Sequence, residues 1–190
     1  MKIHRPRLLI LGHAQHGKDT AAEYLRDKHG YQFVSSSWFM AERVVFPAMM
    51  YCNKKNFGIH QFPYANAKEA FEDRANHRGF WYEQIAAYNA NDPARLTKAI
   101  FAEGNDMYVG LRNARELHAG RLQKAFDLAI WIDASLRCAS EHKSSCTVEP
   151  WMADVIVDNN GTLEDLAINI QHLYNNWIKD EEWEGLDDDF

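Results

Sequence analysis

The segment Gly12-His13-Ala14-Gln15-His16-Gly17-Lys18-Asp19-Thr20 decides how the rest of the chain folds. It follows an apolar stretch, Leu8–Leu11, that predicts a buried strand, and it precedes Ala21–Leu25, which predicts a helix. Two glycines let the backbone wrap so that successive N–H groups point at one anion. The following helix adds the positive end of its dipole, and Lys18 adds a mobile full charge. This order of strand, loop, lysine and helix predicts a loop that binds the phosphates of a nucleotide.

The residue after the lysine departs from the common form of such loops. That position usually holds Ser or Thr, whose hydroxyl binds Mg²⁺, but here it is Asp19, and the hydroxyl follows at Thr20. We therefore expect Mg²⁺ as cofactor, with Thr20 or Asp19 as its protein ligand. His13 and His16 either donate hydrogen bonds to the nucleotide or only shape the loop.

Composition indicates one globular domain followed by an acidic tail. The chain has 190 residues and a net charge of −6, and seven of its 27 acidic residues lie within 180–190. Residues 1–179 are thus near neutral, which argues against direct nucleic-acid binding. No stretch is long and apolar enough for a membrane span, and no signal-peptide pattern precedes the first strand. With three cysteines and no disulfide pattern, we expect a cytoplasmic protein, in the host cell if it is phage-encoded.

Strand-like and helix-like segments alternate along the chain. Apolar runs predict strands at 8–11, 31–34, 107–111, 126–132 and 153–157. Helices are expected at 18–29, 38–52 with a bend at Pro47, 66–76, 79–90, 93–103, 113–118 and from Thr162 onward, where Leu163, Leu166, Ile170, Leu173 and Trp177 form a stripe. This alternation predicts an α/β fold with a parallel, doubly wound sheet. Ligands of such sheets bind at the carboxyl ends of the strands.

With these segments placed, the sequence resembles the P-loop nucleoside monophosphate kinases, most of all those of phages that act on deoxynucleotides. The resemblance is carried by Gly12–Thr20, by Val109–Glu116 and by Ala153–Thr162. It implies a five-stranded sheet of order 2-3-1-4-5, an acceptor-binding helical region at about 36–105 and a lid at about 134–152. The implied reaction transfers the γ-phosphate of ATP to a (deoxy)nucleoside 5′-monophosphate and supplies DNA precursors. The alternatives are a kinase of another small metabolite, such as a nucleoside or coenzyme precursor, and a nucleotide-dependent switch or ATPase.

Phosphoryl transfer requires positive charge around the transferred group, so arginines and lysines at the strand ends are the candidates for catalysis. Lys18 and Arg112 are expected at the phosphates, and Arg137 could reach them from the lid. Arg74 and Arg78 have the i, i+4 spacing that would place both on one helix face. The acceptor-binding candidates are Ser36, Arg43, Arg74, Arg78, Trp81 and Arg112, and Asn160 and Gly161 are expected beside the adenine.

Two further patterns bear on metals. Kinases of the resembled type place an aspartate at the end of the third strand, where this chain has Gly110, so the metal ligands are left to Asp19, Thr20 or Asp133. Cys138, His142 and Cys146 are spaced by four in the expected lid and suggest a metal clip, although zinc normally requires four ligands.

The acidic tail 180–190 ends in Phe190 and suggests two roles. It either keeps the protein soluble or docks it to a basic, apolar pocket on a replication protein. The sequence leaves open whether the protein forms a homodimer.

Overall fold

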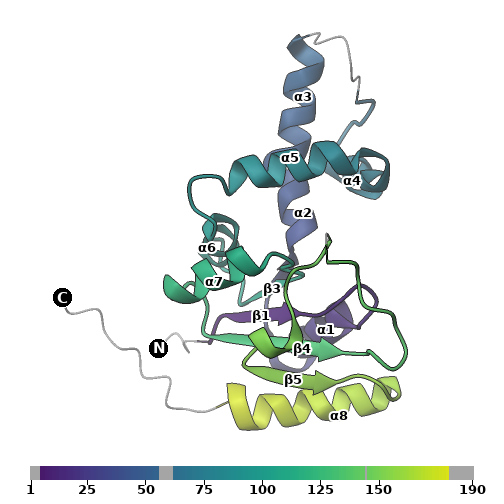
Figure 1. Cartoon of the computed structure of the whole chain (residues 1–190), viewed down its shortest axis with the longest axis vertical. Helices are drawn as coiled ribbons and strands as arrows, with labels where there is room; N and C mark the ends of the chain where they lie inside the picture. Colours follow the sequence, from purple (N-terminus) through teal and green to yellow (C-terminus); the bar gives the residue numbers. More distant parts are fainter. Residues whose placement is uncertain (1–4, 56–61, 144, 180–190) are drawn as a thin grey trace, which may run out of the picture.

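Five short strands form one parallel sheet with the order β2-β3-β1-β4-β5. The computed structural model describes residues 5–55, 62–143 and 145–179. The strands are β1 (Leu8–Leu11), β2 (Phe33–Ser35), β3 (Met107–Val109), β4 (Leu128–Asp133) and β5 (Val155–Asp158). The predicted α/β fold and its strand order are confirmed. The arrows of β1, β4 and β5 point the same way in Figure 1, and β3 pairs with β1 in parallel, so the ends of β1, β3 and β4 come together at one edge.

Both faces of the central strands β1, β3 and β4 are buried, which explains why these strands are continuously apolar rather than alternating, whereas the edge strand β5 exposes Ile156. On β1, Leu9 and Leu11 belong to one apolar core, and Leu8 and Ile10 belong to the other. The first core includes residues of the helices between β2 and β4, whereas the second includes residues of the first and last helices. The helices are therefore divided between the two faces, as the doubly wound prediction requires.

The regular α-helices connect successive strands or follow the last one. They are α1 (Lys18–His29), α2 (Ser36–Met40), α3 (Phe46–Lys55), α4 (Ala67–Glu72), α5 (Arg78–Tyr88), α6 (Arg95–Ala102), α7 (Ala114–Leu122) and α8 (Leu163–Leu173). Shorter helical turns of other pitch are η1 (Ala41–Val45), η2 (Arg74–His77), η3 (Pro150–Met152) and η4 (Tyr174–Ile178). Helix α1 has the predicted bounds and ends at Gly30, which has the left-handed conformation typical of a helix stop.

The region between β2 and β3 extends away from the sheet as a helical arm (Figure 1). Helices α2 and α3 follow one axis in Figure 1, with the wider π-turn η1 between them. Pro47 has no N–H, so the carbonyl of Arg43 loses its ordinary helical partner, and the backbone widens in the preceding turn. Pro47 thus coincides with a change of helical pitch rather than with the predicted bend.

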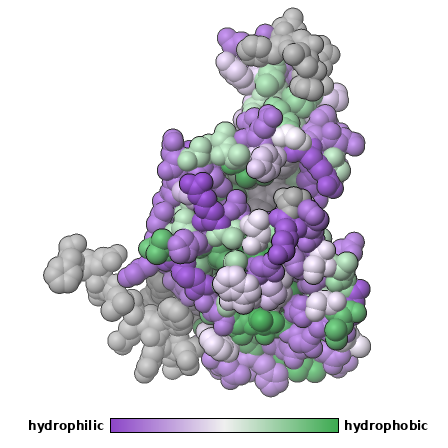
Figure 2. Space-filling model, in the orientation of Figure 1, coloured by the Kyte–Doolittle hydropathy of each residue, from purple (hydrophilic) through white to green (hydrophobic). Residues whose placement is uncertain are grey.

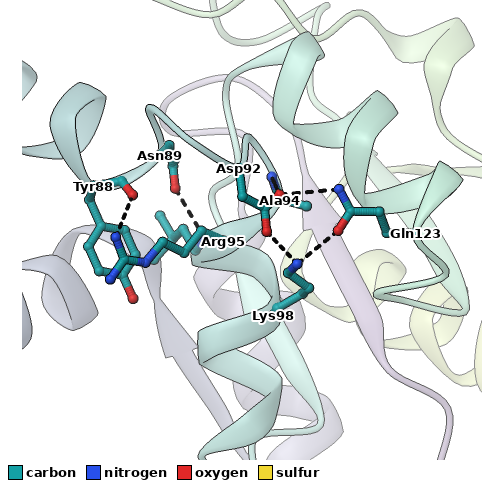
Figure 3. A network of polar contacts seen from close by, with 8 residues as sticks. Tyr88, Asn89, Asp92, Ala94, Arg95, Lys98 and Gln123 are labelled. Carbon is teal, nitrogen blue, oxygen red and sulfur yellow. Dashed lines mark hydrogen bonds and ion pairs between the residues drawn. The ribbon is translucent and has the colours of Figure 1, made fainter.

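The junction between the arm and the sheet is fixed by the start of α6. The carboxylate of Asp92 accepts the N–H of Ala94 at 3.0 Å and also pairs with Lys98, which donates to Gln123 at 2.8 Å (Figure 3). Arg95 lies over the Tyr88 ring at 4.1 Å and donates to the Tyr88 carbonyl. Asp92 lies in the turn before α6 and is not its cap, since the helix begins after Ala94 without a side-chain cap. The Gln123 side chain also donates to Asp92 at 3.2 Å, which ties the start of α6 to the end of α7.

The last helix buries only part of its expected stripe. Leu166, Ile170 and Leu173 are buried, whereas Leu163 and Trp177 are exposed, so the prediction for these two residues was wrong. Trp177 lies in η4, where the helix pitch has changed and the 3.6-residue repeat no longer holds. Figure 2 shows apolar side chains on the lower part of its visible face, where Figure 1 places β5 and α8.

Within the described residues, no helix is long and apolar enough to span a membrane. The acidic tail 180–190, with its proposed docking role, lies outside the described residues.

Candidate active site at the P-loop

The loop between β1 and α1 has a backbone that only glycine fits at two positions. Gly12 has φ +139°, and a Cβ there would lie 2.6 Å from the carbonyl oxygen of Ile132. Gly17 has φ +89°, and a Cβ there would lie 2.3 Å from Nδ2 of Asn159. Both contacts are closer than side-chain atoms tolerate, and both φ values fall in the region that favours glycine. The two glycines of the motif therefore allow the loop to pack directly against the ends of β4 and β5.

Lys18 begins α1 and is held inside the loop. Its side chain is buried, and Nζ donates to the carbonyl oxygen of His13 at 2.6 Å. Burial lowers the pKa of Lys18, and the nearby guanidinium of Arg112 lowers it further. An ammonium placed in this way is stabilised by an incoming anion, as a lysine that binds phosphate should be.

Two buried side chains attach the loop to its neighbours. His16 Nδ1 accepts the N–H of Ala134, the first residue after β4, at 3.1 Å. Asn159, the first residue after β5, donates from Nδ2 to the carbonyl of His16 at 2.9 Å. The loop is thereby connected to the ends of the neighbouring strands β4 and β5, and the shaping role is favoured for His16.

His13 lies beneath the loop rather than on its surface. Its ring contacts Trp131 edge-on at 5.1 Å between centroids, and it contacts His16 in the same way at 5.2 Å. Burial lowers the pKa of His13, and His16 lowers it further, which favours the neutral ring. Its Nδ1 atom has no hydrogen-bond partner among the described residues.

Arg112 reaches the loop from the end of β3 and meets a carboxylate there. Its guanidinium pairs with Glu141, which belongs to the segment between β4 and β5. The other oxygen of Glu141 accepts the N–H of Ala14, a loop residue, at 2.8 Å. The backbone carbonyl of Arg112 accepts the N–H of Thr147 at 2.9 Å, which holds this segment beside β3. The loop and Arg112 thus converge on one anionic group, the Glu141 carboxylate.

The residues expected at the lid and at the adenine lie on the far side of the loop, by β5. Arg137 donates from Nε and from a terminal nitrogen to the carbonyl of Asn159, at 2.9 and 2.5 Å. Asn160 accepts the N–H of Leu136 at 2.8 Å and also donates to Asp158. A Cβ on Gly161 would lie 2.5 Å from the carboxylate of Asp165, which forms a capping box with Thr162 at the start of α8. The guanidinium of Arg137 thus binds the carbonyl of Asn159 in this arrangement.

The expected acceptor residues are only partly brought together. Ser36 lies beside the end of β3, where its hydroxyl donates to the carbonyl of Gly110 at 3.3 Å. Arg43 instead pairs with Glu103 at 2.9 Å on the surface, just before β3 begins. Trp81 is 6% exposed and packs in the apolar core, with an indole N–H that has no partner among the described residues.

The prediction that Arg74 and Arg78 share one helix face was wrong. The predicted helix 66–76 ends at Glu72, so Arg74 lies in the 3₁₀ turn η2 and Arg78 begins α5. Asp73 causes the break because its carboxylate accepts the Tyr64 hydroxyl and the Asn76 side chain, which competes with continued helix. Arg74 folds back over the Phe71 ring at 4.1 Å and donates to the Phe71 carbonyl.

The metal candidates divide into two groups. Asp19 and Thr20 are exposed in the first turn of α1 next to Lys18, and their oxygens have the chemistry that Mg²⁺ requires. Asp133 at the end of β4 accepts hydrogen bonds from the backbone and hydroxyl of Ser135.

The proposed clip of Cys138, His142 and Cys146 is not assembled, because Cys138 donates to the Gln15 carbonyl and Cys146 to the Val148 carbonyl. Cys146 instead lies with His13 and Glu141, whose potential ligand atoms are all within 4.8 Å of one another.

Sequence reasoning missed Glu141 and the structural role of Asn159. Both act through contacts that span more than a hundred residues of sequence, from Ala14 to Glu141 and from His16 to Asn159. The position of Asn159, immediately after the last strand, is the one signal that could have indicated it.

No protein-family model matches this chain, and neither does any curated protein. Among solved structures, TT1252 from Thermus thermophilus is similar, with a TM-score of 0.52 and 15% sequence identity over 92% of this chain and 99% of that one. A shikimate kinase from Bacteroides thetaiotaomicron is also similar, with a TM-score of 0.44 and 12% identity over 90% of this chain and 98% of that one. At 15% identity, the likeness to TT1252 is one of fold, and it extends over almost the whole of both chains.

Proposed function

We propose that this protein is a kinase that transfers the γ-phosphate of ATP to a (deoxy)nucleoside 5′-monophosphate and so forms the diphosphate. The observation that supports this most strongly is the single anion position where the loop backbone and Arg112 meet. A carboxylate there is bound by the Ala14 N–H and by the Arg112 guanidinium, with the Lys18 ammonium close by. Amides and cations from two strand ends around one anion form the environment that phosphoryl transfer needs.

In this proposal each residue has a positioning or electrostatic role. The amides of Gly12–Thr20 and Lys18 hold the β- and γ-phosphates of ATP, while Asn159 and His16 keep the loop in shape. Arg112 neutralises charge on the transferred group, since its planar guanidinium binds two phosphate oxygens at once. Mg²⁺, held by Thr20 or Asp19, would offset charge between the phosphates when bound. Ser36, which lies next to Gly110 at the end of β3, binds the acceptor in this proposal.

A second candidate is a kinase whose acceptor is another small metabolite. It is favoured by the placement of the arginines in the arm, because Arg43 is paired with Glu103 and Arg74 is bound to Phe71. If Arg43 and Arg74 keep these partners, a nucleoside monophosphate would have to be bound through Ser36, Arg78 and Arg112.

The test measures ADP formation from Mg-ATP with each common deoxynucleoside and ribonucleoside monophosphate in turn. We expect turnover that depends on one or a few monophosphates and that falls on the order of 10²–10³-fold in Lys18→Ala. Lys28→Ala, which removes an exposed lysine from the same helix, is the matched control and should behave as wild type. Turnover with a different small acceptor would favour the second candidate, and slow hydrolysis that no acceptor stimulates would contradict both.

A further inference from the structure

The carboxylate of Glu141 occupies a position in the phosphate-binding loop. One oxygen accepts the Ala14 N–H at 2.8 Å, and the other pairs with the Arg112 guanidinium. The Glu141 side chain is only 15% exposed, although it comes from the irregular segment between β4 and β5. A glutamate that is largely buried against a loop amide and a guanidinium is held by specific partners rather than by chance contact.

The chemistry of these partners is that of a phosphate site. Backbone N–H groups of a glycine-bounded loop and an arginine at the next strand end bind phosphate oxygens in the same geometry in which they bind a carboxylate. Lys18 directs its ammonium to the His13 carbonyl instead of to Glu141, so one cation of the site is left for a further negative charge. Glu141 thus provides one negative charge where a nucleotide phosphate brings more.

A metal ion is a poorer explanation for this cluster. His13, Glu141 and Cys146 could offer three ligand atoms within 4.8 Å of one another. However, both oxygens of Glu141 are already engaged, and the Cys146 thiol donates to the Val148 carbonyl. Burial raises the pKa of Cys146, which disfavours the thiolate that a metal needs. Lys18 and Arg112 add two positive charges beside the same position, so an anion is favoured there.

We propose that Glu141 is an internal occupant of the phosphate site, which the phosphates of the donor nucleotide must displace from Ala14 and Arg112. The inference rests on the proposed function in so far as the loop binds a phosphate-containing donor. Glu141 then lowers the affinity of the free protein for polyphosphate and frees Arg112 only when the donor is bound. Arg112 thus becomes available only once the donor is bound, and this timing discourages transfer of the phosphoryl group to water.

The experiment measures binding of inorganic tripolyphosphate and of Mg-ATP to the full chain by calorimetry, in wild type, Glu141→Gln and Glu149→Gln. Glu149 belongs to the same segment and pairs with Lys143 at 3.9 Å, so its substitution makes the same change of charge without touching Ala14 or Arg112. We expect Glu141→Gln to bind tripolyphosphate about tenfold more tightly than wild type, and Glu149→Gln to bind within about twofold of it.

Hydrogen exchange at the Ala14 amide gives a second readout, because tripolyphosphate should replace Glu141 as the acceptor of this N–H. The amide should exchange slowly in free wild type and in Glu149→Gln, faster in Glu141→Gln, and slowly again in all three with tripolyphosphate bound. Glu141→Asp, whose side chain is one methylene shorter, serves as a second variant if the glutamine variant folds poorly, and it should also bind more tightly than wild type.

Equal affinity in Glu141→Gln and Glu149→Gln, with wild type binding Mg-ATP normally, would overturn this inference and leave the proposed function standing. A gain in wild-type affinity on adding a chelator would do the same, because it would assign the cluster to a metal. Failure of all variants to bind any polyphosphate would instead contradict the proposed function itself.

Discussion

Gly17 is constrained by a side chain from the other end of the chain as well as by its own backbone. A Cβ at this position would lie 2.3 Å from Nδ2 of Asn159, which is the atom that donates to the His16 carbonyl. We expect Gly17→Ala to lower the free energy of unfolding by about 1–3 kcal/mol and to abolish ATP binding, because the loop must move to admit the methyl group.

Urea unfolding and ATP titration would measure both effects of Gly17→Ala. Gly79→Ala is the matched control, since a Cβ on Gly79 meets no atom within 4 Å and should leave both quantities close to wild type. Normal ATP binding by Gly17→Ala would show that Asn159 does not fix the loop.

Lys18 makes phosphate affinity depend on pH in the alkaline range. Its pKa is lowered from the ordinary 10.5 by burial and by Arg112, so the free protein loses this proton at a lower pH than an exposed lysine does. The protonated form binds the anion, and affinity for Mg-ATP should therefore fall as the pH rises through the alkaline range below 10.5, the ordinary pKa of lysine.

Calorimetric titrations across that range would test this dependence. In Lys18→Arg the guanidinium keeps its proton, so binding should be weaker but nearly independent of pH. An equally steep fall in Lys18→Arg would assign the effect to another group.

At the scale of single residues, the sequence predicted those whose role is local. The two glycines and Lys18 belong to one short motif, and their geometry follows from the loop itself. Arg112 could be inferred because it leaves a strand at the edge where ligands bind. Asn159 and Glu141 could not be inferred in the same way, because each acts on the loop from more than a hundred residues away, across strands whose register is known only from the fold.

Among the elements, α6, α7 and β3 meet around a buried carboxylate. Glu116 is 6% exposed, and one of its oxygens accepts the hydroxyl of Thr97 at 2.9 Å and that of Tyr108 at 3.3 Å. Burial raises the pKa of Glu116 from 4.5 to about 7, with the hydrogen bonds opposing this shift. The folded protein thus binds this proton more tightly than the unfolded chain, so its stability should fall as the pH rises from about 4.5 through about 7.

We expect Glu116→Gln to remove this contribution, which amounts to about 3 kcal/mol between the two limits. The variant should be more stable than wild type at pH 8 and similar to it at pH 5, because glutamine still accepts the two hydroxyls. Urea unfolding at both pH values measures the difference. A variant less stable than wild type at pH 8 would contradict the assignment of Glu116 as a carboxylate that is costly to ionise.

Elements with a regular apolar repeat were predicted more accurately than those with competing side chains. Helix α1 has the expected bounds because Gly30 ends it in a left-handed conformation. The helix expected at 66–76 failed because Asp73 and Asn76 bond to each other and to nearby groups rather than continue the helix. The interpretation of Arg74 and Arg78 failed with it, since i, i+4 spacing has meaning only within one helix.

For the molecule as a whole, alternation of strands and helices predicted a parallel sheet, while the resemblance supplied its order. The sheet could be inferred because its central strands β1, β3 and β4 are buried on both faces and therefore apolar along their length. The arm could be located but not described, because its packing around Trp81 and Phe39 depends on contacts between separate helices. The acceptor depends on a few hydrogen bonds within that arm, so its identity is left to experiment.

The central claim is that the loop and Arg112 transfer a phosphoryl group rather than merely bind a nucleotide. The most direct test follows the label from γ-³²P-ATP in the presence of the monophosphates, with wild type, Lys18→Ala and Arg112→Ala compared. We predict that wild type places the label on a nucleoside diphosphate. In both variants the yield of this labelled diphosphate should fall by at least the same factor as the formation of ADP. Label recovered as inorganic phosphate in wild type, whatever acceptor is present, would contradict the claim and indicate a nucleotide-hydrolysing switch.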